Sequence, residues 1–169
     1  MQTTNIKLYT MSYSEVKTYL VATLFIVGNM ALPQLCHLMP QGGMIWLPIY
    51  FFTLIGAYKY GWKVGLLTAI ASPLVNSLLF GMPAVAVLPA ILMKSTLLAM
   101  AAGIMAQRSH KVTWFSLLAV ILIYQVLGTM GEWALTGSLY LALQDFRMGL
   151  PGMALQLIGG YLVLNVIRD

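Results

Sequence analysis

The chain has 169 residues, of which 60% are hydrophobic and only 8% are charged. Soluble domains carry about 25% charged residues, and the nine basic and four acidic side chains here are too few to cover a water-exposed surface. This composition excludes an ordinary cytosolic enzyme and a disordered tail. The basic residues are scattered, without the patch that nucleic-acid binding needs. We therefore expect an integral membrane protein with a single domain, residues 1–169.

Long apolar runs without two-residue alternation predict membrane-spanning helices. Residues 1–16 are polar and are expected to form a cytoplasmic or interfacial lead-in. Turns rich in glycine, proline and polar residues then separate six predicted spans, at about 17–38, 44–58, 62–80, 85–107, 112–135 and 149–167. The second is short and is also compatible with a re-entrant segment. The first is longer than the apolar region of a signal peptide, so we expect it to remain uncleaved.

The basic residues predict the orientation. With the N-terminus in the cytoplasm, only Arg147 falls outside, together with Asp145, whereas seven basic residues fall on the cytoplasmic side: Lys7, Lys17, Lys59, Lys63, Arg108, Lys111 and Arg168. This asymmetry follows the positive-inside rule and supports an even number of spans. The sequence thus predicts an all-α bundle of six transmembrane helices with both termini in the cytoplasm.

Polar side chains within the predicted spans gather in the outer half of the membrane. At about 1.5 Å of rise per residue, Lys94 and Gln125 lie about 14 Å below the outer ends of their helices, and Glu132 lies roughly 5 Å below. The same count gives about 6, 6, 14 and 9 Å for Asn76, Gln34, Asn29 and Gln156. Intramembrane polar groups usually face a protein interior or a wet cavity. We therefore predict a cup that opens to the outside.

Each of these side chains also has a structural interpretation. Lys94 is expected to contact a ligand, to pair with Glu132, or to do both, and a lysine that snorkels to the interface is a further alternative. Amides such as Asn76, Gln34 and Gln125 also form hydrogen bonds between membrane helices. His37 follows Cys36, and although imidazole and thiolate bind soft metals, this single pair predicts no metal site.

Aromatic residues accompany the polar cluster near the predicted outer surface: Trp46, Trp133, Tyr140 and Tyr50. Such residues either form the interfacial aromatic belt of a membrane protein or stack against a flat ligand. Small residues recur every four positions near the cytoplasmic end of two spans: Gly61, Gly65 and Ala69, then Ser95, Ala99 and Gly103. Such stripes let helices approach closely, either within the bundle or against a partner membrane protein.

Motifs of catalysis are absent from the sequence. It has no Walker A, HExxH, GxSxG or CxxC motif and no pair of carboxylates at catalytic spacing. We therefore do not expect an enzyme, and a membrane enzyme acting on a lipid is the least supported interpretation. An ion-coupled transporter normally carries more buried acids, and the inverted repeat of a secondary transporter is missing.

Three motifs between Pro40 and Gly103 point to a known family: PQGGMIWLP (residues 40–48), YGWKVGLLTAIASPLVNSLLFGMP (60–83) and KSTLLAMAAG (94–103). They resemble the substrate-binding S components of energy-coupling factor (ECF) vitamin transporters. The chain departs from similar proteins in carrying Tyr50 where they often have histidine and Lys94 where they often have an acidic residue. Its first span has Ala22, Gly28 and Ala31 in place of the Ala-x-x-x-Ala spacing that often contacts the coupling subunit.

The resemblance implies an outward-facing pocket for a water-soluble vitamin or related micronutrient, in a bacterial or archaeal cytoplasmic membrane. The protein would tilt within the lipid, driven by a transmembrane coupling subunit and two cytosolic ATPases. ATP is used by those partners, no cofactor is bound by this chain, and no nucleic acid is involved. The predicted interface to the coupling partner is the set of small residues Gly61, Gly65, Ala69, Ser95, Ala99 and Gly103.

In the predicted pocket, Lys94 would neutralise a carboxylate, a phosphate or a polarised carbonyl, and Glu132 would hold Lys94 or accept from ligand N–H groups. Neutral hydrogen bonds would come from Asn76, Gln125 and Gln156, and Trp46 or Trp133 would stack. Gln34, His37 and Tyr50 complete the predicted site. The alternative function is a structural or assembly protein of a cell-envelope complex, in which the polar cluster only joins helices.

Overall fold

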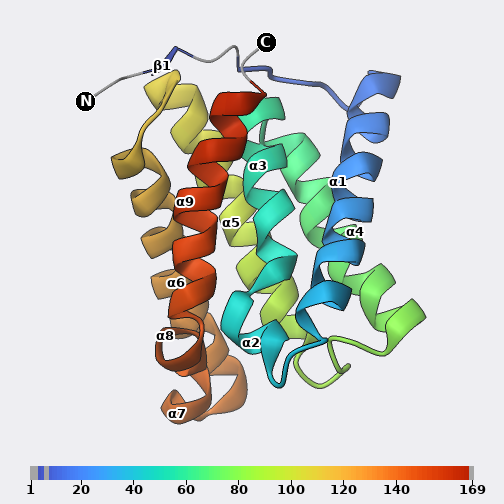
Figure 1. The fold of residues 1–169 in the computed structure, drawn as a ribbon, viewed down its shortest axis with the longest axis vertical. Coiled ribbons are helices and arrows are strands. Elements are labelled where there is room, and N and C mark those ends of the chain that lie inside the picture. The colour runs from blue at the N-terminus through green and yellow to red at the C-terminus, as the bar shows by residue number, and fades with distance from the viewer. Residues whose placement is uncertain (1–3, 6–7, 168–169) are drawn as a thin grey trace.

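The computed structural model describes residues 4–5 and 8–167 and shows a bundle of helices (Figure 1). Within the described residues, four helices are long and apolar enough to cross a membrane: α1 (Val16–Cys36), α4 (Trp62–Phe80), α5 (Leu88–Ser109) and α6 (Trp114–Thr136). A shorter apolar helix, α9 (Leu150–Val166), follows at the C-terminal end. These helices confirm the predicted all-α class and indicate a transmembrane protein.

Glycines and a polar cap set the ends of the long helices close to the predicted positions. The third predicted span and α4 coincide, and α4 ends at Gly81, whose φ of 68° is left-handed. Helix α6 begins with a capping box in which Thr113 and Ser116 bond to each other's backbone N–H groups, and it ends at Gly137 with a φ of 67°. Side chains in these positions satisfy backbone groups that a helix end leaves free, and glycine adopts the left-handed turn without strain.

The second predicted span is not one helix. It divides into α2 (Gly42–Trp46), the 3₁₀ turn η1 (Pro48–Tyr50) and α3 (Phe51–Tyr60). The break is at Leu47, which has a φ of 46° and a ψ of 45°. Pro48 explains the position, because proline disfavours right-handed helical geometry in the residue before it. The continuous helix expected over residues 44–58 is therefore wrong.

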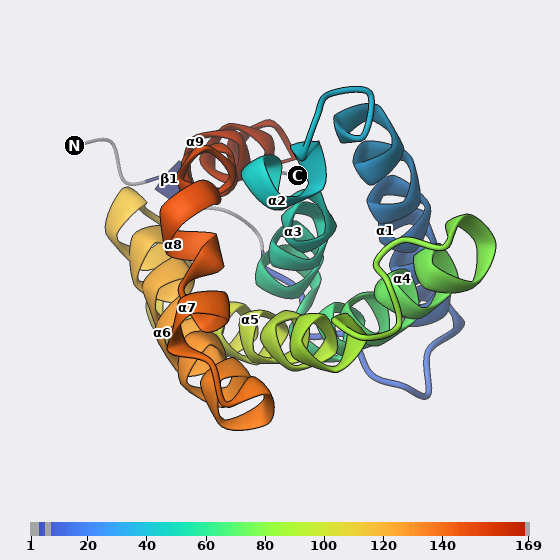
Figure 2. The same ribbon diagram turned by 90° about the horizontal axis from the view of Figure 1, so that it is seen from below.

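Helix α3 occupies the centre of the bundle. Figure 2 shows it surrounded by α1, α4, α5 and α9. Leu54, Ile55, Ala57 and Tyr58 are all 0% exposed. A ten-residue helix is too short to cross a bilayer alone, but the neighbouring helices shield α3 from lipid.

The two ends of the bundle differ. At one end, β1 (Thr4–Asn5) pairs antiparallel with β2 (Lys111–Val112), so part of the predicted lead-in over residues 1–16 is a strand, and no helix precedes Val16 in the described residues. At the opposite end, the short helices α7 (Leu139–Ala142) and α8 (Gln144–Met148) lie next to α6 and α9 (Figure 1).

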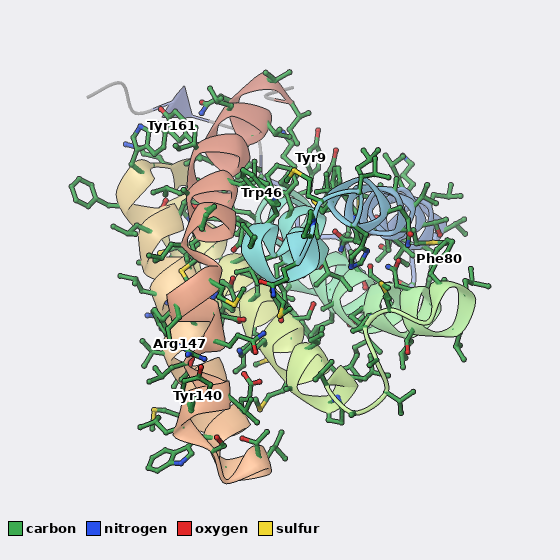
Figure 3. The ribbon with its side chains drawn as sticks, turned by 60° about the horizontal axis from the view of Figure 1, so that its bottom comes forward. Tyr9, Trp46, Phe80, Tyr140, Arg147 and Tyr161 are labelled. Carbon is green, nitrogen blue, oxygen red and sulfur yellow. The ribbon has the colours of Figure 1, made fainter. Side chains whose placement is uncertain are left out.

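Basic side chains gather at the β1–β2 end, on the helix ends and the strand that meet there: Lys17, Lys59, Lys63, Arg108 and Lys111. Lys7 and Arg168 lie outside the described residues. Arg147 lies at the opposite end, on α8, where its guanidinium carbon is 3.6 Å from the centre of the Tyr140 ring (Figure 3). The predicted separation of charge between the two ends is thus present in the folded chain.

The small residues of the two stripes are buried inside the bundle. A Cβ added at Gly103 would lie 2.8 Å from the Cα of Trp62, and one at Gly65 would lie 2.9 Å from the Cα of Ala57. Gly61, Ala69, Ser95 and Ala99 are buried as well. These six residues therefore do not form an exposed partner interface, as was predicted; instead they let α3, α4 and α5 pack closely.

A buried hydrogen-bond network joins α1, α3 and α4. The Asn29 side-chain amide donates to Thr53 Oγ1 at 3.0 Å and to Ser72 Oγ at 3.2 Å, and its oxygen accepts from the Phe52 N–H at 3.2 Å. Asn76 Nδ2 donates to the backbone oxygens of Asn29 and Ser72, both at 2.9 Å. Asn76 therefore acts as an interhelical link, the structural interpretation given above.

The glycine packing predicts the effect of adding one methyl group. Gly103→Ala should destabilise the protein by about 1–3 kcal/mol, because the new Cβ meets the backbone of Trp62. Gly131→Ala is the matched control: its Cβ meets only the flexible end of Met93, and alanine gains up to about 1 kcal/mol in helix propensity. Unfolding of the purified proteins in detergent measures both, and equal stability of the two variants would contradict this packing.

Candidate functional site

A cavity of about 450 Å³ lies at the bundle end that carries α7 and α8. It is open on one side and is lined by the end of α1, α2, η1, the turn over residues 82–87, α5, α6, α7 and α8. Much of its wall is apolar, with contributions from Pro33, Pro48, Ile49, Met82, Val87 and Ile91. The volume falls within the range of about 300–1,000 Å³ typical of small-molecule sites.

Three charged side chains meet on the cavity wall. Lys94 Nζ on α5 is 2.5 Å from Glu132 Oε2 on α6 and 2.8 Å from Asp145 Oδ2 on α8. The side chains of Lys94, Glu132 and Asp145 are 3%, 16% and 14% exposed. An ammonium group removed from water needs such partners, because an unpaired buried charge is strongly unfavourable. The predicted pairing of Lys94 with Glu132 is present, and a second carboxylate completes it.

Gly128 makes room for the Lys94 side chain. A Cβ at Gly128 would lie 2.6 Å from Lys94 Cγ, so the stem of the lysine passes directly over the backbone of α6. Glu132 follows Gly128 by four residues and therefore lies on the same face of the helix. This arrangement carries the ammonium group toward the carboxylate one turn further along α6.

Asp145 was not among the predicted site residues. It lies beyond the predicted spans, on the short helix α8 (Figure 2), and it lines the cavity. The sequence did contain a signal for Asp145: a buried Lys94 needs carboxylate partners, and Asp145 and Glu132 are the only acidic residues between Glu15 and Asp169.

Two further predicted residues, His37 and Tyr50, also line the cavity. Tyr50 is 3% exposed, and its ring centre is 5.5 Å from that of Tyr124. Polar side chains that were not predicted also reach the cavity: Gln41, Thr136 and Gln144. Four of the ten predicted residues, namely Lys94, Glu132, His37 and Tyr50, thus line the same cavity.

The other six predicted residues do not line this cavity, and Asn76 belongs to the network described above. Gln125 and Gln156 are joined through Tyr124: Gln125 Nε2 donates to the Tyr124 hydroxyl at 3.1 Å, and that hydroxyl donates to Gln156 Oε1 at 2.9 Å. This hydrogen-bonded trio is next to the cavity wall, because the Tyr124 ring packs against the ring of Tyr50. It connects α6 with α9.

The two tryptophans and Gln34 also lie elsewhere. Trp133 is 51% exposed. Trp46 is on α2, where its backbone oxygen is 2.5 Å from the Cβ that Gly152 would carry (Figure 3). Gln34 is partly buried on α1, and its Nε2 has no hydrogen-bond partner within the described residues.

Several buried polar atoms on α5, α6 and α9 lack hydrogen-bond partners within the described part of the chain: Ser95 Oγ, Gln125 Oε1, Thr129 Oγ1 and Gln156 Nε2. Gln125, Thr129 and Glu132 follow one face of α6 at i, i+4 and i+7. The polar stripe therefore continues inward beyond the charged cluster, as the spacing predicted. No group of three or more His, Cys, Asp or Glu side chains suited to a metal ion occurs in residues 4–5 and 8–167.

The charged cluster predicts a large effect of removing its cation. Lys94→Met leaves two partly buried carboxylates without their cation and should cost up to about 3 kcal/mol of stability, the lower end of the range for breaking a buried ion pair. Adding Glu132→Gln should recover part of that loss, because one repelling charge is removed. Lys63→Met, whose ammonium lies over the Tyr13 and Trp62 rings at the opposite end, is the control and should change stability far less. Equal losses in Lys94→Met and Lys63→Met, measured by unfolding in detergent, would contradict the pairing.

Comparison of the chain with protein-family models, with curated proteins and with solved structures finds no match in any of the three. Function is therefore inferred from the cavity, its charges and the arrangement of the helices.

Proposed function

We propose that the chain is a membrane-embedded binding subunit, similar to the S components of ECF transporters, for uptake of a small water-soluble vitamin or related micronutrient. The observation that carries this proposal is the cavity of about 450 Å³ with three charged groups, at the bundle end opposite the cluster of basic residues. A binding site that opens away from the basic end faces the outside, because basic residues favour the cytoplasmic side.

Six crossings belong to the proposal: α1, the broken segment α2–η1–α3, α4, α5, α6 and α9. The broken segment covers residues 42–60, which corresponds to about 28 Å if every residue rose as in an α-helix. With an even number of crossings, both termini are in the cytoplasm of a bacterial or archaeal cell. The β1–β2 pair and the basic helix ends then face the cytoplasm.

In this proposal the chain binds its ligand and does not transform it. A transmembrane coupling subunit and two cytosolic ATPases supply the energy, and ATP is used by them alone. The small residues proposed for the coupling interface lie inside the bundle, so the coupling subunit has to contact another surface of the helices. Exposed apolar side chains are available on α1, among them Leu20, Leu24 and Val27.

A structural or assembly protein is the second candidate. The interhelical hydrogen bonds of Asn29 and Asn76 favour it, since they use predicted polar residues for packing alone. The two functions differ in whether a small molecule occupies the cavity.

Filling the cavity separates these functions. Ala90, on the cavity wall, is 8% exposed, so Ala90→Phe places a ring where the ligand would bind. Ala134 is exposed on α6, and Ala134→Phe is the matched control. Native mass spectrometry of the purified proteins should show a retained small molecule in the wild type and in Ala134→Phe, and its loss in Ala90→Phe. Empty wild-type protein associated with another protein would favour the structural role.

The proposed orientation has its own test. In a Cys36→Ser background, Tyr140→Cys places a thiol at the α7 end, where residue 140 is 70% exposed, and Gln107→Cys places one at the exposed end of α5. A membrane-impermeant maleimide added to intact cells should label position 140, and position 107 only after permeabilisation. The reverse pattern would invert the proposed topology.

A further inference from the structure

The charges of the cavity wall do not cancel. Lys94 supplies one positive charge, while Glu132 and Asp145 supply two negative charges. Among the described residues, His37 also lines the cavity, and its imidazole is taken as neutral, as in the formal net charge of the chain at pH 7. Arg147 is not among the lining residues; its guanidinium stacks on Tyr140 and donates to the Tyr140 carbonyl at 2.9 Å. With neutral histidine, the wall therefore carries a net charge of −1.

Each carboxylate keeps one oxygen for another donor. Lys94 contacts Glu132 through Oε2 and Asp145 through Oδ2. Among the described residues, no hydrogen bond or ion pair engages Glu132 Oε1 or Asp145 Oδ1. A carboxylate accepts several hydrogen bonds, and both side chains are on the cavity wall. The cavity thus offers negatively charged acceptors, whereas two of the three N–H groups of its one buried cation already contact these carboxylates.

The remaining wall suits an apolar body. Proline, leucine, isoleucine, valine and methionine side chains supply most of its surface, and Tyr50 contributes an aromatic ring. The charged side chains of the cavity wall are together at Lys94, so a charged group of a ligand would fit best next to the carboxylates. An anionic group placed there would approach two carboxylates at short range and would be repelled by them.

We propose, on the basis of the binding function above, that the cavity selects a small organic monocation: a protonated amine on an apolar or aromatic body, with its N–H groups donating to Glu132 and Asp145. The Lys94 ammonium shares the two carboxylates with the ligand, and it changes the net charge of the group from −2 to −1. This matches a single positive charge and disfavours a dication. The role expected for Lys94 from the sequence, neutralising a ligand anion, is replaced by a role in setting the charge of the site.

Three probes of similar size and different charge test this selectivity: benzylammonium, benzyl alcohol and benzoate, each titrated at pH 7 into the full-length protein in detergent. Benzylammonium should bind with a Kd at least tenfold below that of benzyl alcohol, and benzoate should not raise the Tm. Benzoate binding as tightly as benzylammonium, or equal binding of benzylammonium and benzyl alcohol, would overturn the proposal.

Charge variants locate the preference. Glu132→Gln and Asp145→Asn each bring the net charge to zero and should remove most of the tenfold difference. Glu132→Asp keeps the charge and should retain the preference, so loss of folding is distinguished from loss of charge. Glu15→Gln is the control, because Glu15 is exposed and lies outside the cavity. A preference that survives both neutral variants would also overturn the proposal.

The molecule that is retained on purification separates the two proposals. If a stoichiometric ligand is lost in Ala90→Phe but carries a negative charge or none, the binding function stands and the cation selectivity fails. If the protein is empty on purification but still prefers benzylammonium, the selectivity of the cavity stands and the uptake function fails.

Discussion

One buried ammonium group sets the architecture of the candidate site. Lys94 is 3% exposed within an apolar bundle, and the free energy of an unpaired charge there would be prohibitive. Its two partners come from α6 and α8, so the ion pair that neutralises the lysine also holds α8 against α5. Gly128 belongs to this arrangement, because any larger residue would displace the lysine stem. The ion pairs of Lys94 thus determine both the charge of the cavity wall and the position of α8 beside it.

The long helices were predictable from sequence, because runs of about 20 apolar residues have few other stable arrangements in a membrane. The break at Leu47 was not, since the composition of residues 44–58 is as apolar as that of a continuous span. The break is tolerated because α3 is surrounded by protein. Pro48 was the local signal, but a proline within α4, Pro73, leaves that helix unbroken. Tertiary packing decides between these outcomes.

The candidate site was predicted in part for a related reason. Counting residues gives a depth along the helix axis, and this placed Lys94 and Glu132 correctly in the halves of α5 and α6 that lie toward the α7–α8 end. Depth carries no information about the direction in which a side chain points, so Asn76, Gln125 and Gln156 were grouped with residues that they do not face. Asp145 was missed because a short helix that folds back across the bundle has no periodicity to reveal it.

Helix α9 has a consequence for the surrounding lipid. Its 17 residues reach about 26 Å, whereas a typical hydrocarbon core is about 30 Å thick. Unlike α3, it is not shielded: Leu150, Ile158 and Leu162 are all more than half exposed. A bilayer adapts to a short apolar stretch by thinning beside it. In the proposed arrangement with six crossings, the flank formed by α9 would match shorter acyl chains than the flank formed by α1, and the stability of the protein would depend on the lipid composition of the membrane.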